Sequence, residues 1–261
     1  MDLDKIIEIK GENPGPKSMI MVGVHGNERC GLEALAKLLP TLKIDKGLLL
    51  VAYGNPEAIK NKQRIYETNL NRMFRDDELL SDAEKNSYEY GRAQVLKTYL
   101  NQVEALIDIH ASSAPESQRF IICEPNAQAI TDYLPFDLKV YGFDTVEPGG
   151  TDYYMNKIGK VGICVECGQL DDPASTAVAT ESIITFLQAR GHRAGGELTI
   201  RNQDIIQMTS LYLSQTDSFR LSKDFRDFET LNAGELIGTD GAEEVRAERD
   251  GIILFATNLD K

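Results

Sequence analysis

Apolar runs of strand length, separated by helical patterns, constrain the fold of this chain more than any other feature of its sequence. They occupy residues 19–22, 48–53, 105–109 and 161–165. Parallel strands that are buried on both faces have nearly continuous apolar sequences of this kind, because helices cover each face of their sheet. The alternation therefore predicts an α/β fold, with a mixed, largely parallel sheet and helices on both of its faces.

Helical patterns alternate with these runs. Leucines at helical spacing follow the first run, and the pattern ends at Pro40, which cannot continue a helix. A longer pattern covers about residues 83–105, with an apolar face that includes Val95. A further helix is expected from Asp172-Pro173, a typical helix start, to Gly191, a typical stop.

The sequence pattern changes near Gly195-Gly196. From there on, short segments of alternating polarity, such as 205–214, 229–239 and 251–257, are separated by glycine turns, without a convincing long helix. We therefore expect a first domain over residues 1–193 and a smaller β-rich domain over residues 194–261.

Charge and composition exclude several classes of partner. The chain has 28 basic and 41 acidic residues, so its field repels nucleic acid and anionic membranes. No segment approaches the roughly 18 apolar residues of a membrane helix, and the first ten residues do not resemble a signal peptide. Four cysteines are too few for a disulfide framework. We expect a cytoplasmic protein that binds neither nucleic acid nor a membrane.

Polar side chains follow three of the apolar runs: His25, His110 and Glu166. Because ligands of α/β sheets bind beyond the carboxyl ends of the strands, these side chains are expected at one edge. Glu28 lies three positions after His25, and two imidazoles with one carboxylate are a common ligand set for catalytic zinc. The alternative is structural, since histidines at strand ends are more often hydrogen-bonded than metal-bound.

Arginines cluster in the segment 64–75, where Arg64, Asn71, Arg72 and Arg75 lie close together in an acidic protein. Guanidinium groups bind carboxylates through paired hydrogen bonds, so the cluster indicates a small anionic substrate. The alternative is a solvated loop in which these arginines pair with neighbouring acidic residues of the same stretch, 67–77.

Together these motifs resemble the succinylglutamate desuccinylase and aspartoacylase family, which has a zinc carboxypeptidase-like fold. The resemblance rests on G-x-H-G-N-E at 23–28, R-x(6)-N-R at 64–72, D-x-H at 108–110 and V-E-x-G at 165–168. Their order and spacing over residues 20–170 are more specific than any one motif. The β-rich C-terminal segment also resembles the smaller domain of that family.

The resemblance implies a metal and a catalytic group. His25, Glu28 and His110 would bind one zinc ion per subunit, and Glu166 would act as general base and then as general acid. Arg64 would polarise the scissile carbonyl. Each role agrees with general chemistry, because zinc lowers the pKa of bound water and a nearby carboxylate can take its proton.

The resemblance also implies a substrate. Asn71 and Arg72 would hold the carboxylate of the amino-acid part of a small anionic N-acyl amino acid. The chain would then be a zinc-dependent hydrolase, an amidohydrolase that cleaves the linear amide bond of an N-acyl amino acid or a similar small carboxylate.

The chain departs from the family pattern at two places. Asn69 stands where family members often carry an aspartate, which acts as a partner of a zinc-bound histidine, and asparagine brings no charge. In the region where a further substrate-binding arginine is usual, this sequence offers Asn156, Lys157 or Lys160. The acyl group is therefore expected to differ from succinyl and from that of acetyl-aspartate.

Two other functions stay open. One is a carboxypeptidase-like peptidase. The other is a non-catalytic binding module, because the C-terminal segment resembles part of a lipoyl or biotinyl barrel. Lysine is absent between Asp224 and Asp260, which argues against an attached cofactor. We interpret the segment as a cap over the zinc site and leave self-association as a homo-oligomer open.

Cys164 and Cys167 form a C-x-x-C that could be a redox pair or half of a structural zinc site. It interrupts an apolar strand, and the sequence has no second C-x-x-C to complete a four-cysteine site. We predict two small buried side chains beside Glu166. His192 follows a helix end and is expected to be exposed to solvent.

Overall fold

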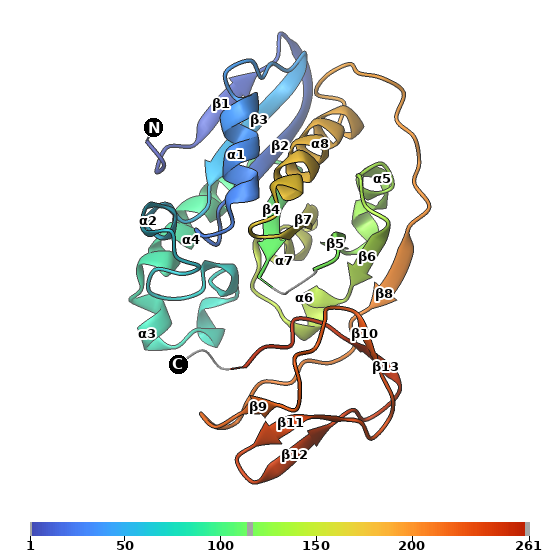
Figure 1. The fold of residues 1–261 in the computed structure, drawn as a ribbon. Helices are drawn as coiled ribbons and strands as arrows, with labels where there is room; N and C mark the ends of the chain where they lie inside the picture. The colour runs from blue at the N-terminus through green and yellow to red at the C-terminus, as the bar shows by residue number, and fades with distance from the viewer. Residues whose placement is uncertain (1, 114–116, 259–261) are drawn as a thin grey trace. The chain divides into compact units, whose positions relative to one another are not determined.

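The computed structural model describes residues 2–113 and 117–258 (Figure 1). Contacts divide the chain into two compact units. The first comprises Met1–Ser112 and Arg119–Thr209, and the second comprises Ser113–Gln118 and Ser210–Lys261.

An eight-stranded sheet forms the centre of the first unit. Its strands lie in the order β1 (Ile7–Lys10), β3 (Lys46–Tyr53), β2 (Asn13–Val22), β4 (Ala105–Ser112), β7 (Val161–Gln169), β5 (Phe120–Cys123), β6 (Leu138–Tyr141) and β8 (Asp204–Gln207). Neighbouring strands are parallel except for the pairs β1–β3 and β5–β7. The predicted mixed, largely parallel sheet is therefore confirmed.

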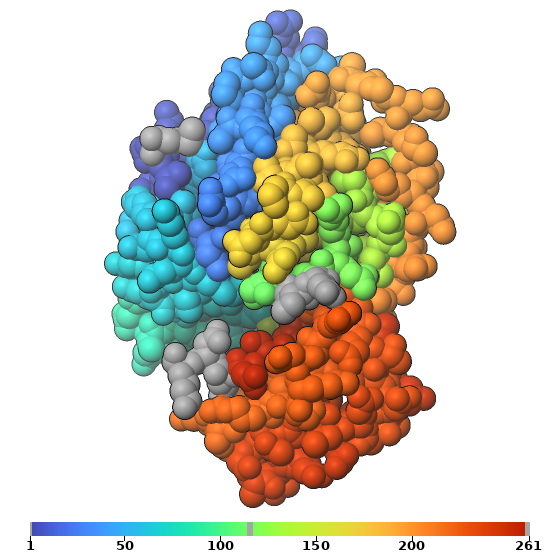
Figure 2. Space-filling model, viewed as in Figure 1, coloured from blue at the N-terminus to red at the C-terminus, as the bar shows by residue number. Residues whose placement is uncertain are grey.

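Helices cover both faces of the sheet, as predicted. On one face, α1 (Arg29–Leu38) and α8 (Pro173–Ala189) lie side by side (Figures 1 and 2). On the other face, α4 (Tyr88–Leu100) and α7 (Thr151–Lys157) share a second apolar core with β2 and β4. Successive residues of β2 alternate between the two cores, because strand side chains alternate in direction.

The other helices are short. They are α2 (Pro56–Asn61), α3 (Asp82–Lys85), α5 (Gln128–Thr131) and α6 (Phe143–Val146), and single 3₁₀ turns span Leu70–Arg72, Asp77–Leu79 and Pro125–Ala127. Within residues 2–113 and 117–258, no helix has the length and apolar character needed to cross a membrane.

The helix predicted over 83–105 is interrupted. Ser87 lies between α3 and α4, and its side chain caps α4 by accepting a hydrogen bond from the Tyr90 N–H. Val95, placed on the apolar face by the sequence pattern, is 45% exposed. Leu96 and Leu100, which the same pattern places on this face, are buried together with Ala93.

The second unit is β-rich, as predicted. It contains β9 (Arg220–Leu221), β10 (Glu229–Leu231), β11 (Leu236–Asp240), β12 (Glu243–Arg246) and β13 (Gly251–Ile253), which form two small antiparallel sheets. Strand β8 pairs with β6, so residues up to Thr209 group with the first unit. That division falls later than the domain boundary expected between residues 193 and 194, which stays a prediction.

The expectation that His192 is exposed is wrong. Its side chain is fully buried, and its Nδ1 atom lies 3.0 Å from the Lys46 carbonyl oxygen. Its own carbonyl accepts hydrogen bonds from the Asp45 and Lys46 N–H groups. The chain after α8 therefore folds back onto the start of β3 instead of entering solvent.

Burial lowers the pKa of His192. The unfolded chain, with a histidine pKa of about 6.5, then takes up a proton before the folded protein does. The contribution of His192 to stability is complete above that pH and declines as the pH falls toward the lower folded value. In urea titrations, we expect the free energy of unfolding to fall more between about pH 8 and pH 5 for the wild type than for His192→Asn. Equal losses would contradict a buried neutral imidazole.

Candidate metal centre

Three parallel strands bring the predicted site residues to one edge of the sheet. His110 in β4 and Glu166 in β7 are register partners, so their side chains lie on the same face of the sheet. His25 and Glu28 lie just beyond the end of β2, the other neighbour of β4. All four side chains are buried. The convergence expected at the carboxyl ends of the strands is therefore present.

The turn after β2 depends on two glycines. Gly23 has a φ of +68°, a conformation that glycine adopts without strain. A Cβ atom at Gly26 would lie 2.1 Å from the Ala58 carbonyl carbon, so only glycine permits this approach. Beyond Gly26, the Glu28 N–H donates to the His25 carbonyl at 3.2 Å. This tight turn returns the Glu28 side chain to the imidazole of His25.

The Glu28 carboxylate is the centre of the cluster. Its Oε1 atom lies 2.7 Å from His25 Nδ1 and accepts a hydrogen bond of 2.9 Å from Arg64 Nη1. Its Oε2 atom lies 2.9 Å from His110 Nδ1 and accepts from the Ala111 N–H at 3.2 Å. Two imidazoles, one guanidinium and one backbone amide thus surround a single buried carboxylate.

The opposite nitrogen of each imidazole also faces an oxygen. His25 Nε2 lies 3.2 Å from Asn69 Oδ1, and His110 Nε2 lies 3.3 Å from Asp108 Oδ2. A neutral imidazole carries one N–H. If each Nε2 atom carries the N–H, both Nδ1 lone pairs point at the Glu28 carboxylate. Lone pairs and a carboxylate repel each other, so this arrangement requires protons or a cation between the nitrogens and the carboxylate oxygens. The two Nδ1 atoms and the Glu28 carboxylate are suitable ligands for a zinc ion, which binds imidazole nitrogen and carboxylate oxygen.

Electrostatics in the cluster follow from burial and opposite charge. Burial raises the pKa of Glu28, but the two histidines outweigh it and hold this pKa well below its usual range. Burial lowers the pKa of His25. For His110, burial also lowers the pKa, but the nearby Asp108 and Glu28 carboxylates outweigh it and raise the pKa well above its usual value. Glu28 is therefore an anion, the form that binds a metal.

A second group of possible metal ligands adjoins the first. Ligand atoms of His110, Cys164 and Glu166 lie within 4.8 Å of one another, as do those of His25, Glu28 and His110. Burial raises the pKa of the Cys164 thiol, which disfavours the thiolate that binds metals. The two histidines with Glu28 are therefore the better ligand set. Cys164 and Cys167 are both buried in β7, as predicted.

The arginines of the segment 64–75 pair with carboxylates outside the stretch 67–77. Arg64 contacts Glu28, Arg72 forms an ion pair with Glu147, and Arg75 Nη2 donates to Glu84 Oε1 at 2.7 Å. The alternative of a solvated loop with pairs inside its own segment is wrong. Arg64 nevertheless keeps an exposed side chain (51%), so part of its guanidinium faces solvent beside the cluster.

Asn71 is tied to the cluster by both its backbone and its side chain. Its N–H donates to Asn69 Oδ1 at 3.0 Å, the same oxygen that faces His25. Its Oδ1 atom accepts from the Thr151 N–H at 3.3 Å. Because the amide oxygen is used in this way, the NH₂ group is the end that can donate to a substrate carboxylate.

The residues suggested in place of a further substrate-binding arginine point elsewhere. Lys157 forms an ion pair with Asp76. Lys160 donates to the Asn101 carbonyl at 2.8 Å and precedes β7, whereas Glu166 lies toward the other end of that strand. Asn156 Oδ1 accepts from the Gly162 N–H at 3.0 Å. The expectation that one of them faces the site is therefore wrong.

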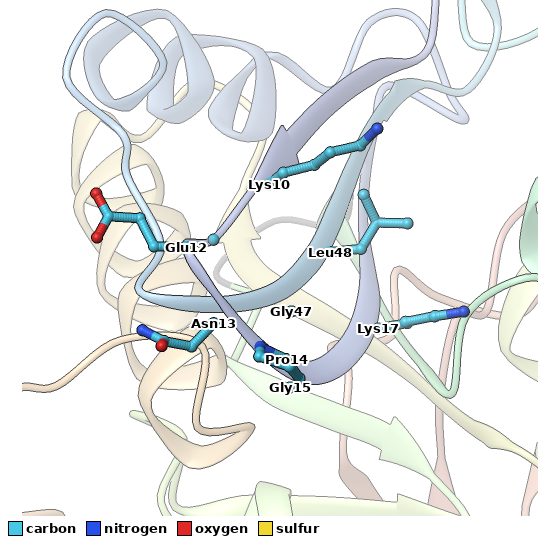
Figure 3. A pocket seen from close by; sticks show the side chains of 9 residues that line it. Lys10, Glu12, Asn13, Pro14, Gly15, Lys17, Gly47 and Leu48 are labelled. Atoms are coloured by element: carbon cyan, nitrogen blue, oxygen red, sulfur yellow. The ribbon is translucent and has the colours of Figure 1, made fainter.

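A surface hollow of about 470 Å³ lies away from this cluster. Residues at the start of β2 and β3 line it, at the opposite ends of the strands from His25. Among its charged side chains, Lys10 and Lys17 extend toward one side and Glu12 toward the opposite side, so they do not meet at a common point (Figure 3). This hollow lacks the convergent polar groups of a catalytic site.

The sequence interpretation missed Glu89, which shapes the loop between Arg64 and Asn69. Its fully buried carboxylate accepts hydrogen bonds from the N–H groups of Tyr66, Glu67 and Thr68 at 2.8–3.3 Å. It also accepts from Asn55 Nδ2 at 3.0 Å. No local sequence signal identifies this role, because Glu89 resembles any acidic residue in the first turn of a helix.

Glu89→Gln replaces one acceptor oxygen by an NH₂ group that faces backbone donors. We expect a loss of about 2 kcal/mol in the free energy of unfolding, since buried donors lose their acceptor. Hydrogen exchange at residues 66–68 should become faster. Glu104→Gln is the control: Glu104 is 59% exposed in its pair with Arg190, so the change should cost less than about 1 kcal/mol. Unchanged exchange in Glu89→Gln would contradict the anchoring role.

Comparison with known proteins agrees with the motifs. Succinylglutamate desuccinylase from Shewanella baltica (strain OS185) is 24% identical over 277 residues, which cover 95% of this chain and 80% of that protein. A probable aspartoacylase from Trichodesmium erythraeum (strain IMS101) is 26% identical over 216 residues, 73% of this chain and 70% of that protein.

A solved structure shares the fold. The crystal structure of succinylglutamate desuccinylase from Vibrio cholerae matches with a TM-score of 0.81 at 20% identity, covering 97% of this chain and 81% of that one. The sequence profile of the succinylglutamate desuccinylase/aspartoacylase catalytic domain matches residues 14–189, which include every motif residue described above. The chain therefore belongs to the succinylglutamate desuccinylase/aspartoacylase family, as its motifs predict.

Proposed function

We propose that this protein is a zinc-dependent deacylase that hydrolyses the amide bond of an N-acyl amino acid or a similar small carboxylate. One observation carries the proposal: the Nδ1 atoms of His25 and His110 converge on the buried Glu28 carboxylate, with Glu166 beside His110. Family membership supports the same reaction class, and the named relatives are a desuccinylase and a probable aspartoacylase.

His25, Glu28 and His110 would hold one zinc ion. Bound zinc supplies a water of lowered pKa, about 7, and polarises a carbonyl. The chain itself orients the ligands, because Asn69 and Asp108 contact the opposite nitrogens of the two imidazoles. Asn69 does this without the charge that an aspartate would bring.

Glu166 is the general base in this proposal. Its side chain is buried, and a carboxylate oxygen lies within 4.8 Å of a nitrogen of the ligand His110. Its carboxylate accepts a proton from the attacking water and then returns it to the leaving amine nitrogen.

Arg64, Asn71 and Arg72 act on the substrate. Arg64 already donates to Glu28, and its exposed N–H groups stabilise the charge that develops on the carbonyl oxygen in the transition state. The NH₂ group of Asn71 and the guanidinium of Arg72 bind the carboxylate of the amino-acid part. Arg72 is half-buried beside Glu147, which holds its guanidinium in place before substrate binds.

Metal removal tests the ligand set. The wild type should bind about one zinc ion per subunit, and treatment with a chelator should abolish hydrolysis until zinc is restored. His25→Ala and His110→Ala should each bind far less zinc by elemental analysis. His192→Asn, at the third histidine of the chain, should retain stoichiometric zinc. Full zinc content in both ligand variants would refute the assignment.

Glu166→Gln tests the chemistry separately from metal binding. We expect turnover to fall by about 10²–10⁴-fold, with zinc still bound, because the general base is lost. The substrate panel should include N-succinyl and N-acetyl amino acids, other N-acyl amino acids and short peptides. Cleavage of N-acyl amino acids supports a deacylase, whereas cleavage of peptides alone indicates the carboxypeptidase-like alternative. Wild-type turnover in Glu166→Gln would remove its proposed role.

A further inference from the structure

Thr151, the first residue of α7, lies behind the proposed metal ligands and is fully buried. Its hydroxyl donates a hydrogen bond of 2.5 Å to Asp108 Oδ2. Its backbone N–H donates to Asn71 Oδ1 at 3.3 Å. One residue therefore contacts both a neighbour of a proposed metal ligand and a proposed substrate-binding residue.

The Asp108 carboxylate depends on this hydroxyl. Asp108 lies two residues before His110 on the same face of β4, and its side chain is fully buried. Its Oδ2 atom approaches His110 Nε2 to 3.3 Å without the alignment of a full hydrogen bond. Among the described residues, its Oδ1 atom has no hydrogen-bond partner. The Thr151 hydroxyl is thus the aligned donor that fixes the direction of this carboxylate.

A chain of hydrogen bonds connects the Thr151 backbone to His25. Asn71, which accepts from the Thr151 N–H, donates its own N–H to Asn69 Oδ1, and this oxygen faces His25 Nε2. Two residues before Thr151, the Gly149 carbonyl accepts from the Phe74 N–H at 3.2 Å. The start of α7 is therefore bound to the segment that carries Asn69 and Asn71.

We propose that Thr151 is a positioning residue of the metal centre. Its hydroxyl holds the Asp108 carboxylate behind His110, and its N–H holds Asn71, so that one metal ligand and one substrate-binding residue share an anchor. This inference rests on the proposed zinc site.

The physical reason is the orientation of the His110 ring. A partner on Nε2 selects the tautomer and the ring angle that direct the Nδ1 lone pair at the metal, and loss of such partners typically weakens metal binding about 10–100-fold. Thr151→Val keeps the shape of the side chain but removes the donor. The Asp108 carboxylate can then rotate, because the described residues offer it no second aligned hydrogen bond.

Zinc affinity of the metal-free protein tests the proposal without an activity assay. A chromophoric chelator competes with wild type, Thr151→Val, Thr151→Ser and Thr176→Val for zinc. Thr176 is the matched control, since its buried hydroxyl also donates to a carboxylate, Glu33 Oε2 at 2.9 Å, on the α8 side of the sheet. We expect about tenfold weaker binding in Thr151→Val and wild-type binding in Thr176→Val. Thr151→Ser, which keeps the hydroxyl, should stay within about threefold of the wild type.

Two further measurements separate positioning from general stability. Thr151→Val and Thr176→Val each lose one hydrogen bond to a carboxylate, so both should unfold at a lower urea concentration than the wild type. Only Thr151→Val should alter the visible absorption spectrum of the cobalt-substituted protein, which reports the geometry of the ligands. If Thr151→Val does not fold, Thr151→Ala is judged by the same criteria.

Suppose that the wild type binds one equivalent of zinc. The proposal is then overturned if Thr151→Val binds zinc as tightly as the wild type does. It is also overturned if Thr151→Ser loses as much affinity as Thr151→Val, because the hydroxyl would then not be the cause. A wild type that binds no zinc would reject the proposed function itself, and this result is distinct from both others.

Discussion

The site depends on the hydrogen bonds and ion pairs that surround the buried Glu28 carboxylate. A charge removed from water is costly unless it is paired and hydrogen-bonded. Here four groups from three segments approach it: His25 from its own turn, Arg64 from the following loop, and His110 with the Ala111 N–H from β4. The end of β2, the 64–72 segment and the end of β4 therefore come together around one anion, and the same arrangement is suited to a divalent cation.

Strand register and a second buried carboxylate, Glu89, hold the segments around Glu28 in place. The parallel pairing of β2, β4 and β7 sets the register that places His110 beside Glu166. Glu89, on the helix α4, holds the backbone of the loop that carries Arg64 and Asn69. Residues around the site are thus held by hydrogen bonds from residues farther out. Such support is needed to hold functional groups within a few tenths of an ångström of a productive geometry.

Sequence patterns predicted the long central strands and failed for short or context-dependent elements. The apolar runs of β2, β3, β4 and β7 have enough residues to show their character. Strands β5 and β6 have four residues each, too few for a periodic signal, and were not predicted. The segment of β8 was predicted as a strand of the C-terminal domain, but it pairs with β6. His192 was expected in solvent because its burial depends on β3, which is distant in sequence.

The sequence by itself determined the fold class, the family and the residue types of the site, because apolar periodicity and motif spacing are local properties of the chain. Only the tertiary structure decided the partners of those residues. Arg64 contacts a carboxylate 36 positions away, and Thr151 contacts one 43 positions away. Such pairs depend on strand register and on the packing of α7 against the sheet, since they form only after distant segments have been brought together by burial of the two apolar cores.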